Sequence, residues 1–216
     1  MGDPAARPPL LIRPAWTAAD LDAVYRLTHD AYVALGYVPP QPDGRLRHYG
    51  DVEAAPENVV LVAEEAGAIV GTVSVTVDGP AGLHVDHDFR AACDAVRAEG
   101  MPVGAAWRIV TLPDHRASSA LVLELIRAVI DVLHRFGVTT ALLSFAPNHE
   151  RAYTRLLGMA TIARTEGAAD LRTPAVLMRA DVPESARRLP PHDNPVLTTL
   201  VAERRRLLEA LRRRAA

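Results

Sequence analysis

The sequence contains no lysine, because all 24 of its basic residues are arginine. Catalysis through a lysine Schiff base is therefore excluded. Cys93 is the only cysteine, which excludes disulfide bonds within the chain and cysteine-rich zinc sites. No apolar run approaches the roughly 20 residues that a membrane-spanning helix requires, so we expect no membrane span.

The chain also lacks a strong excess of charge of either sign. It has 24 basic and 26 acidic residues among 216, a net charge of −2 and a pI near 6.4. A basic excess is typical of nucleic-acid-binding proteins, so we expect no nucleic acid partner. Residues 1–4 lack the basic and then apolar pattern of a signal peptide, and we expect a cytoplasmic protein.

The composition is that of an ordinary globular protein with regular apolar patterning. Hydrophobic residues make up 49% and charged residues 23% of the chain, which suits one well-packed domain. Runs of β-branched residues and apolar residues at helical spacing predict alternating strands and helices. The predicted strands are 10–14, 59–63, 68–77, 103–112, 141–146, 159–165 and 174–180, and the predicted helices are 17–35, 86–99, 119–136 and 148–157.

This order of elements predicts an α/β fold over residues 1–182, with a mixed sheet and helices on its faces. Thr17, with Asp20 three residues later, is typical of a capped helix start. Residues 38–58 hold four prolines and little periodicity, so we interpret them as a loop.

The C-terminal segment differs from the rest in composition. Residues 183–195 contain four prolines and are interpreted as a linker. Residues 196–216 have an apolar stripe at helical spacing and carry six arginines and two glutamates, a net charge of +4. This pattern predicts a basic amphipathic helix. It either docks on its own domain or offers a surface to an acidic partner or a second copy.

The turn between the strand 103–112 and the helix at Ser119 is a candidate anion site. Residues 115–120, with the sequence His-Arg-Ala-Ser-Ser-Ala, combine small side chains and hydroxyls with one guanidinium. The start of a helix exposes unpaired N–H donors at the positive end of the helix dipole, which suits a phosphate. Small polar residues here also serve as ordinary helix caps, so both interpretations stay open.

A short cluster of potential metal ligands lies at His84, Asp86, His87 and Asp88. No second ligand group follows at a spacing typical of a metal site. We favour a solvated loop before a helix and expect no metal.

Three segments of the chain resemble a known family. They are Tyr25–Val38, Ala105–Val110 and Pro147–Met159, and the last is similar to the family's Pro-x-His-x-x-x-Tyr-x-x-x-Leu-Gly-Phe pattern. With the order of elements, they resemble the N-acyl amino acid synthases, relatives of the acyl-homoserine-lactone synthases within the GNAT acyltransferase superfamily. The resemblance covers roughly residues 10–181 and implies a GNAT-like, largely antiparallel mixed sheet.

The resemblance implies transfer of an acyl group from a phosphopantetheine thioester to the amine of a small acceptor such as an amino acid. The thioester would be carried by acyl carrier protein or by coenzyme A. The pantetheine arm is expected between the two central strands, against backbone groups near Val110 and Leu112. Its phosphate is expected at the turn formed by Arg116, Ala117, Ser118, Ser119 and Ala120.

The chain departs from the family's pattern at positions that bear on catalysis. Thr28 stands in place of an arginine, and Ala105 in place of the glutamate of a Glu-x-x-Arg motif that ends at Arg108. Ser119 stands where the superfamily's phosphate-binding turn has a glycine. Deprotonation of the acceptor ammonium is helped by a base such as the missing glutamate. Three interpretations stay open: another group has replaced the missing glutamate, the acceptor differs from the family's, or the activity is lost.

Each candidate residue also has a plainer structural interpretation. His149 is the candidate base, because an imidazole accepts a proton at neutral pH, or it caps the helix. Tyr153 is a candidate acid for the leaving thiolate, or a core aromatic. Arg108 is a candidate for orienting an acceptor carboxylate, or forms a surface ion pair. Tyr32 and Tyr37 are candidates for the acceptor pocket, or pack in its wall.

These observations favour an N-acyltransferase. The alternatives are an acetyl-coenzyme-A-dependent N-acetyltransferase and a non-catalytic binding module that keeps the GNAT fold without its base. The transferase hypothesis depends on a gap between two neighbouring strands beside Arg116, where the thioester arm would lie along unpaired peptide groups.

Overall fold

A seven-stranded sheet forms the centre of the molecule, in the computed structural model that describes residues 10–113, 119–167, 173–190 and 193–215. Its strand order is β1-β2-β3-β4-β5-β7-β6. Only β4 and β5 pair in parallel, and all other neighbours are antiparallel. The predicted mixed, largely antiparallel sheet is therefore confirmed. The strands are β1 Leu11–Pro14, β2 Asn58–Glu65, β3 Ala68–Val77, β4 Val103–Thr111, β5 Thr140–Phe145, β6 Ala160–Thr165 and β7 Ala175–Asp181.

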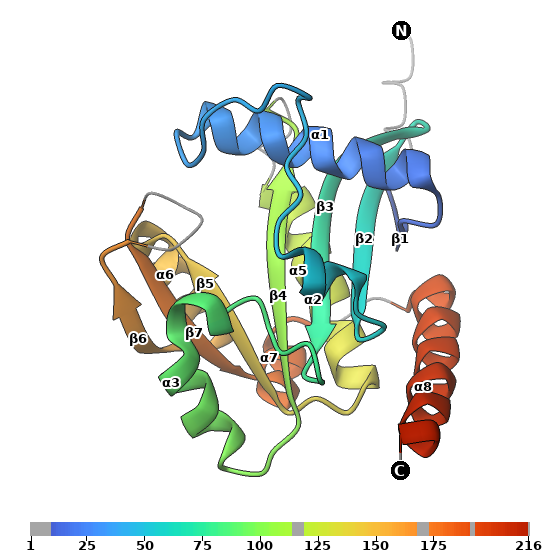
Figure 1. Cartoon of the computed structure of the whole chain (residues 1–216), viewed down its shortest axis with the longest axis vertical. Helices are drawn as coiled ribbons and strands as arrows, with labels where there is room; N and C mark the ends of the chain where they lie inside the picture. Colours follow the sequence, from blue (N-terminus) through green and yellow to red (C-terminus); the bar gives the residue numbers. More distant parts are fainter. Residues whose placement is uncertain (1–9, 114–118, 168–172, 191–192, 216) are drawn as a thin grey trace, which may run out of the picture.

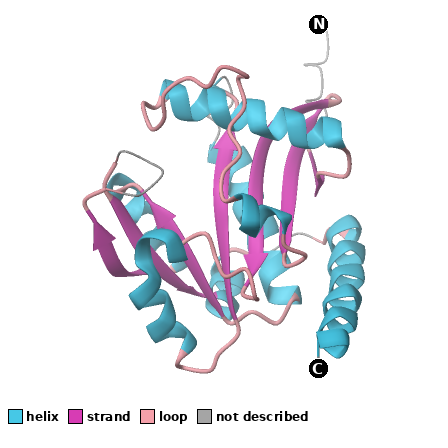
Figure 2. Cartoon of the chain, in the orientation of Figure 1, coloured by secondary structure: helices cyan, strands magenta, loops and turns pink. Residues whose placement is uncertain are grey.

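Helices cover both faces of this sheet (Figures 1 and 2). Helices α5, α6, α7 and α8 share the larger apolar core with one face, while α1 and α3 pack on the other face, where α2 also lies. The helices are α1 Ala18–Ala34, α2 Gly50–Ala54, α3 Asp86–Arg97, α5 Ser119–Arg135, α6 Glu150–Leu157, α7 Val182–Arg188 and α8 Pro195–Ala215, with a 3-10 turn η1 at Pro147–His149.

Helix α1 begins where the capping residues predict. The Thr17 hydroxyl accepts a hydrogen bond from the Asp20 amide at 3.1 Å, and the Asp20 carboxylate accepts one from the Thr17 amide at 3.0 Å. This reciprocal pair satisfies two N–H groups that a helix start leaves unpaired. Leu27 and Ala31 then bury themselves against Val110 of β4. The helix is thereby fixed across the end of β4.

Helix α5 packs closely behind β4. Leu125, Ile126 and Leu133 are among its buried side chains. A Cβ at Gly104 would lie 2.7 Å from a Leu133 methyl group and 3.1 Å from the Thr76 carbonyl oxygen. Only a glycine allows this approach without a shift, so β4 is fixed between α5 and β3.

Two short helices lie where the sequence predicts loop and linker. Helix α2 occupies part of the region 38–58, and α7 occupies the first half of the region 183–195. Asp181 caps α7 by accepting a hydrogen bond from the Glu184 amide at 2.7 Å, and a proline fits the first turn because its missing N–H is not needed there. Proline at this place therefore marks a helix start rather than a linker.

Helix α8 packs on its own chain, beside the β1 edge (Figure 1). Leu197, Val201 and Leu208 are buried there. Asn194 accepts a hydrogen bond from the Val196 amide at 3.1 Å and donates one to the Ile12 carbonyl at 3.0 Å. The helix is thus capped and tied to the sheet by one side chain. Within the described residues, every helix is too short or too polar to traverse a bilayer.

Candidate active site

Strands β4 and β5 separate after a short stretch of pairing. Their ladder joins Val103 to Thr140, Gly104 to Ala141 and Ala105 to Leu142, while β4 continues to Thr111 and β5 to Phe145. The two strands diverge towards the α1 end of the molecule (Figure 1). On its other side β4 stays paired with β3 as far as Thr111. Beyond Ala105, the edge of β4 that faces β5 has no strand partner among the described residues, so its peptide groups can bind an extended ligand.

A β-bulge interrupts β4 within this open stretch. Its register with β3 shifts between Thr72 and Ser74, and Arg108 has a φ of 57°, in the left-handed region. The bulge brings Trp107 and Arg108 to the same face of β4. The Arg108 guanidinium carbon accordingly lies 4.3 Å from a Trp107 ring centroid. A left-handed arginine is uncommon and costly, and such positions concentrate at functional sites.

Arg108 is the most deeply buried charge of this face. Its side chain is 1% exposed, and Nη2 donates to a carboxylate oxygen of Glu53. The other two nitrogens, Nε and Nη1, are buried and have no hydrogen-bond partner in the part of the chain that the structure describes. The predicted surface ion pair is therefore wrong, because the pair lies inside the protein. Two nitrogen atoms of the buried Arg108 guanidinium therefore have no acceptor among the described residues.

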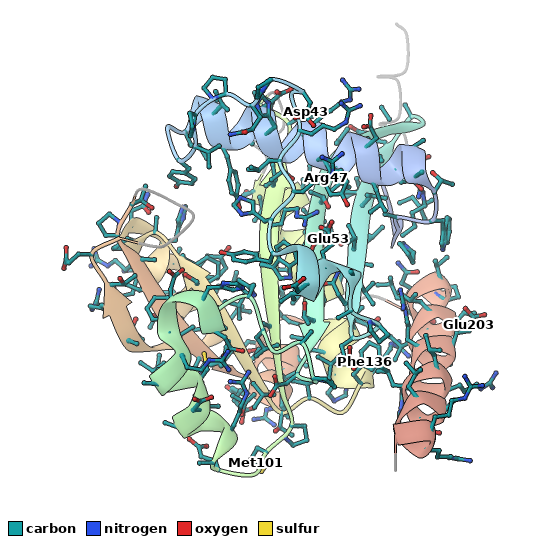
Figure 3. All side chains as sticks on the ribbon, in the orientation of Figure 1. Asp43, Arg47, Glu53, Met101, Phe136 and Glu203 are labelled. Carbon is teal, nitrogen blue, oxygen red and sulfur yellow. The ribbon has the colours of Figure 1, made fainter. Side chains whose placement is uncertain are left out.

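Glu53 belongs to α2 and was not among the residues singled out from the sequence. In the view of Figure 3 it lies in front of the central strands and below α1. Its side chain is 13% exposed. Its Oε1 accepts a hydrogen bond from the Tyr25 hydroxyl at 2.5 Å. Burial raises the pKa of Tyr25 to about 12, and the hydrogen bond to this carboxylate is a smaller contribution in the same direction. Tyr25, Glu53 and Arg108 therefore form one connected polar group.

Tyr32 and Tyr37 lie on the same side as Arg108. Their ring centroids are 5.6 Å apart in an edge-on contact. Burial raises the pKa of Tyr32 to about 12, and the charge of Arg108 acts in the opposite direction. Tyr32 and Tyr37 are therefore in contact with each other, and Tyr32 is near enough to Arg108 to feel its charge.

The histidine cluster predicted as a solvated loop is partly buried. His84 is 4% exposed and stacks on Trp107 with ring centroids 5.7 Å apart. Burial lowers the pKa of His84 to about 3. Asp86 is also buried and pairs with Arg97. Among the described residues, no group of three or more His, Cys, Asp or Glu side chains is arranged to hold a metal ion.

His149 and Tyr153 follow β5, on the other side of the gap. His149 is exposed and occupies the N-cap position of α6 without a side-chain hydrogen bond to the helix. Tyr153 stacks on Phe145 with ring centroids 4.0 Å apart and planes inclined by 12°. Burial raises the pKa of Tyr153 to about 12. Its hydroxyl therefore carries its proton at neutral pH.

An apolar cavity of about 20 Å³ lies between the sheet and helix α5, beside the diverging strands. It is lined from β4 and β5 by Ile109, Ala141 and Leu143, with Tyr153 of α6 and Ile126 of α5 among the other walls. A volume of this size holds about one water molecule, so the side chains nearly fill the interior end of the gap.

A comparison with known families decides the chain's membership. The family model described as N-acyl amino acid synthase FeeM matches residues 23–181, which is more than half of the chain. This chain belongs to the FeeM family of N-acyl amino acid synthases.

Solved structures share the fold of this FeeM-family chain. FeeM, an N-acyl amino acid synthase from uncultured soil microbes, matches with a TM-score of 0.73 and 22% identity over 85% of this chain and 96% of its own. BjaI, a CoA-dependent acyl-homoserine lactone synthase, matches with a TM-score of 0.58 and 19% identity, over 84% of this chain and 82% of its own. A GNAT-family acetyltransferase from Streptococcus pneumoniae matches with a TM-score of 0.52 and 16% identity, over 80% of this chain and 99% of its own. These likenesses show the GNAT fold. The curated protein sequences contain no match.

The structure of this FeeM-family chain describes only some of the residues predicted to bind the acyl donor. Val110 is buried on β4, and the Leu112 amide donates to the Val70 carbonyl at 2.9 Å, so this amide is already used within the sheet. Ser119 and Ala120 are exposed in the first turn of α5. The remaining predicted phosphate-binding residues, Arg116, Ala117 and Ser118, lie outside the described residues.

The two positions predicted to depart from the family's charged residues, Thr28 and Ala105, are neutral and buried. Ala105 is fully buried in the core beneath α3. Thr28 is fully buried in α1, where its hydroxyl donates to the Val24 carbonyl at 2.7 Å. Neither supplies a charge to the site, so Glu53 is the carboxylate that pairs with Arg108.

Proposed function

We propose that this protein is a cytoplasmic N-acyltransferase. It moves an acyl group from a phosphopantetheine thioester, carried by acyl carrier protein or coenzyme A, to the amine of a small acceptor such as an amino acid. The observation that carries the proposal is the separation of β4 from β5 after Ala105 and Leu142. Membership of the FeeM family supports the same reaction class.

The donor would enter the gap between the two strands. Amide groups of the pantetheine arm would pair with the open edge of β4 near Val110 and Leu112, as an added strand pairs with a sheet edge, through peptide groups other than the Leu112 amide, which donates to Val70. The phosphate would bind at the turn from Arg116 to Ala120, before α5, where helix N–H groups attract anions. The acyl chain would lie in the gap and end at its nearly filled apolar wall, beside Ile109 and Leu143.

The acceptor would bind on the α1 face of β4. Two buried nitrogens of Arg108, Nε and Nη1, have no partner among the described residues, and a carboxylate of the acceptor would accept a hydrogen bond from one of them. Tyr32 and Tyr37 would line the same pocket. The acceptor amine would then lie between this face and the thioester in the gap.

The reaction needs a base and an acid. His149 would take a proton from the acceptor ammonium, and the amine nitrogen would then attack the thioester carbonyl carbon. A strand N–H would stabilise the oxyanion of the tetrahedral intermediate. When the intermediate collapses, the carbon–sulfur bond breaks and Tyr153 would protonate the leaving thiolate. The nitrogen would release its second proton through solvent, which restores the Tyr153 hydroxyl, and an amide is formed.

Product formation tests this proposal directly. Purified protein is incubated with acyl-carrier-protein and acyl-coenzyme-A thioesters and a panel of amino acids, and the products are analysed by mass spectrometry. An N-acyl amino acid is the expected product. If folded protein gives no acylated product from any pair, a non-catalytic binding module is favoured instead.

Ligand-induced stabilisation identifies the carrier. A ligand that binds the native state raises its stability by RT ln(1 + [L]/Kd). A rise in Tm with acyl carrier protein thioesters supports the carrier protein as the donor. A rise with acetyl-coenzyme A and none with the carrier protein supports an acetyl-coenzyme-A-dependent N-acetyltransferase.

A further inference from the structure

We propose that helix α8 and the adjoining end of β1 form a surface that binds an anionic lipid bilayer from outside. We call this surface the basic edge, and it comprises Trp16, Arg206, Leu207, Leu211 and Arg214. The inference goes beyond the proposed function, because it concerns where the protein binds and not what it converts.

Exposed apolar side chains gather on the basic edge. Trp16 is 63% exposed, Leu207 42% and Leu211 38%. Trp16 lines a groove of about 390 Å³ together with Leu200 of α8. Leu207 and Leu211 follow Leu200 at helical spacing, which places the three leucines on one side of α8. The groove and the leucines therefore form one apolar strip along the helix.

Positive charge accompanies this strip. Residues 195–215 hold six arginines and two glutamates, a net charge of +4, while the rest of the chain carries −6. Arg206 and Arg214 are exposed on α8. An anionic surface would attract this helix and repel the remainder of the molecule, so the charge distribution would also fix the orientation of the bound protein.

The side chains of the basic edge select a bilayer as the partner. Tryptophan and leucine beside arginine are typical of helices that lie in the membrane interface, where the apolar groups enter the headgroup region. The long arginine side chains reach the lipid phosphates from there. A second copy of this chain fits less well, because two basic edges would bring +4 against +4.

The basic edge lies apart from the place where the proposed donor would enter. Arg205 of α8 donates a hydrogen bond to the carbonyl of Arg135, the last residue of α5, at 3.4 Å. The predicted phosphate site lies at the other end of α5, whose 17 residues span about 25 Å. Figure 1 likewise shows the C-terminal half of α8 at the end of the molecule opposite α1. A carrier protein at the phosphate site is therefore not the partner that this surface fits.

Vesicle binding by the wild-type protein, without donor or acceptor, tests this inference. Sedimentation compares vesicles of phosphatidylcholine with vesicles that also contain about 30% phosphatidylglycerol. We expect at least about tenfold tighter binding to the anionic vesicles. The binding should be lost as the salt concentration rises from about 0.1 M to about 1 M, because the Debye length falls from about 10 Å to about 3 Å.

The two tryptophans of the chain report the contact. Trp107 is 6% exposed, so a change of emission on binding comes from Trp16. Emission should shift to shorter wavelength with anionic vesicles as this ring leaves water. Trp16→Ala should bind the vesicles about tenfold more weakly. Ile162→Ala is the matched control, since Ile162 is 38% exposed on β6, at the opposite edge of the sheet, and it should bind as the wild type does.

A double charge variant tests the electrostatic part. Arg206→Gln combined with Arg214→Gln removes two charges from the basic edge and should weaken binding to anionic vesicles about 30-fold. Arg151→Gln combined with Arg155→Gln is the matched control. Both arginines are exposed on α6, and this variant should keep the wild-type affinity.

Four outcomes overturn the inference. They are equal binding to both kinds of vesicle, unchanged tryptophan emission on binding, wild-type affinity in the variant of Arg206 and Arg214, and an emission shift with acyl carrier protein but none with anionic vesicles. The last would assign the basic edge to a protein partner. The vesicle series uses the wild-type protein, so it remains decisive if a variant does not fold. Because no substrate is present, its result is independent of acyl transfer.

Discussion

Ala105 and Leu142 form the last pair of the parallel ladder between β4 and β5. Both side chains are fully buried beneath α3, so the closed end of the gap is fixed by core packing. Beyond this pair, β4 turns its open edge towards β5. The bulge at Arg108 lies within the same open stretch, so in the proposed reaction one strand would bind the donor along its edge and the acceptor on its α1 face.

The apolar end of the gap should set the length of the acyl chain. Ile109→Ala removes three carbons from the wall of the cavity and should shift the preferred donor to a longer chain, by about two carbons. The truncation of this partly buried isoleucine should also lower stability, by about 2 kcal/mol at most. Competition among acyl donors of different length, read by mass spectrometry, measures the shift.

Ile12→Ala is the matched control for that variant. Ile12 is buried in the same core but lies on the edge strand β1, away from the gap. Its loss should lower stability to a similar extent and leave the chain-length preference unchanged. An identical shift in both variants would show that Ile109 does not contact the acyl chain.

His149 should be needed for turnover and not for folding. It is exposed and makes no side-chain hydrogen bond that caps α6. His149→Ala should therefore leave Tm unchanged and lower kcat by about 10²- to 10⁴-fold, the usual contribution of a general base. His134→Ala removes another exposed histidine, from α5, and should have full activity. Full activity in His149→Ala would assign the base to another group.

Tyr153 should act through its hydroxyl and not through its ring. The ring stacks on Phe145, which Tyr153→Phe preserves. Loss of the proton donor should lower kcat with an alkyl thioester by about 100-fold, with KM and Tm unchanged. With an aryl thioester, whose thiolate leaves without help, the decrease should be much smaller. Equal decreases for the two donors would contradict the acid role.

Local signals made much of the fold predictable. Thr17 and Asp20 mark the start of α1 because their side chains satisfy N–H groups next to them in the sequence. The apolar face of α5 and the β-branched residues of β2 and β3 follow from simple periodicity. Such signals depend only on residues within one element.

The site was less predictable because it depends on contacts between elements. Trp107 and Arg108 share a face only because a bulge breaks the alternation of β4. Glu53 stands on a helix of five residues, which is too short to show periodicity. Arg108 was identified from the sequence, but its burial and its partner were not. Both arise from the packing of α1 and α2 over β4.

Acid should destabilise the protein through His84. Burial lowers the pKa of this histidine to about 3, whereas an unfolded histidine titrates near pH 6.5. Between these values the unfolded state binds more protons, so stability falls as the pH falls, by about 1.4 kcal/mol per pH unit at most. Urea unfolding of His84→Asn from pH 7 to pH 4.5 should show a shallower loss than the wild type.

The neighbouring His87 provides the control for this titration. It is exposed, so His87→Asn should keep the wild-type slope. If the His84→Asn variant loses stability with pH as steeply as the wild type, the acid sensitivity comes from the carboxylates that are ion-paired in the native state.

Helix α8 should stabilise the domain through one row of leucines only. Leu197 is 1% exposed and belongs to the main core, whereas Leu207 is 42% exposed on the same helix. Leu197→Ala should lower the free energy of unfolding by about 2–5 kcal/mol, and Leu207→Ala by less than about 0.5 kcal/mol. Urea unfolding of the two variants measures the difference. Equal small effects would mean that α8 unfolds separately from the domain, so its docking would contribute nothing to the stability of the sheet.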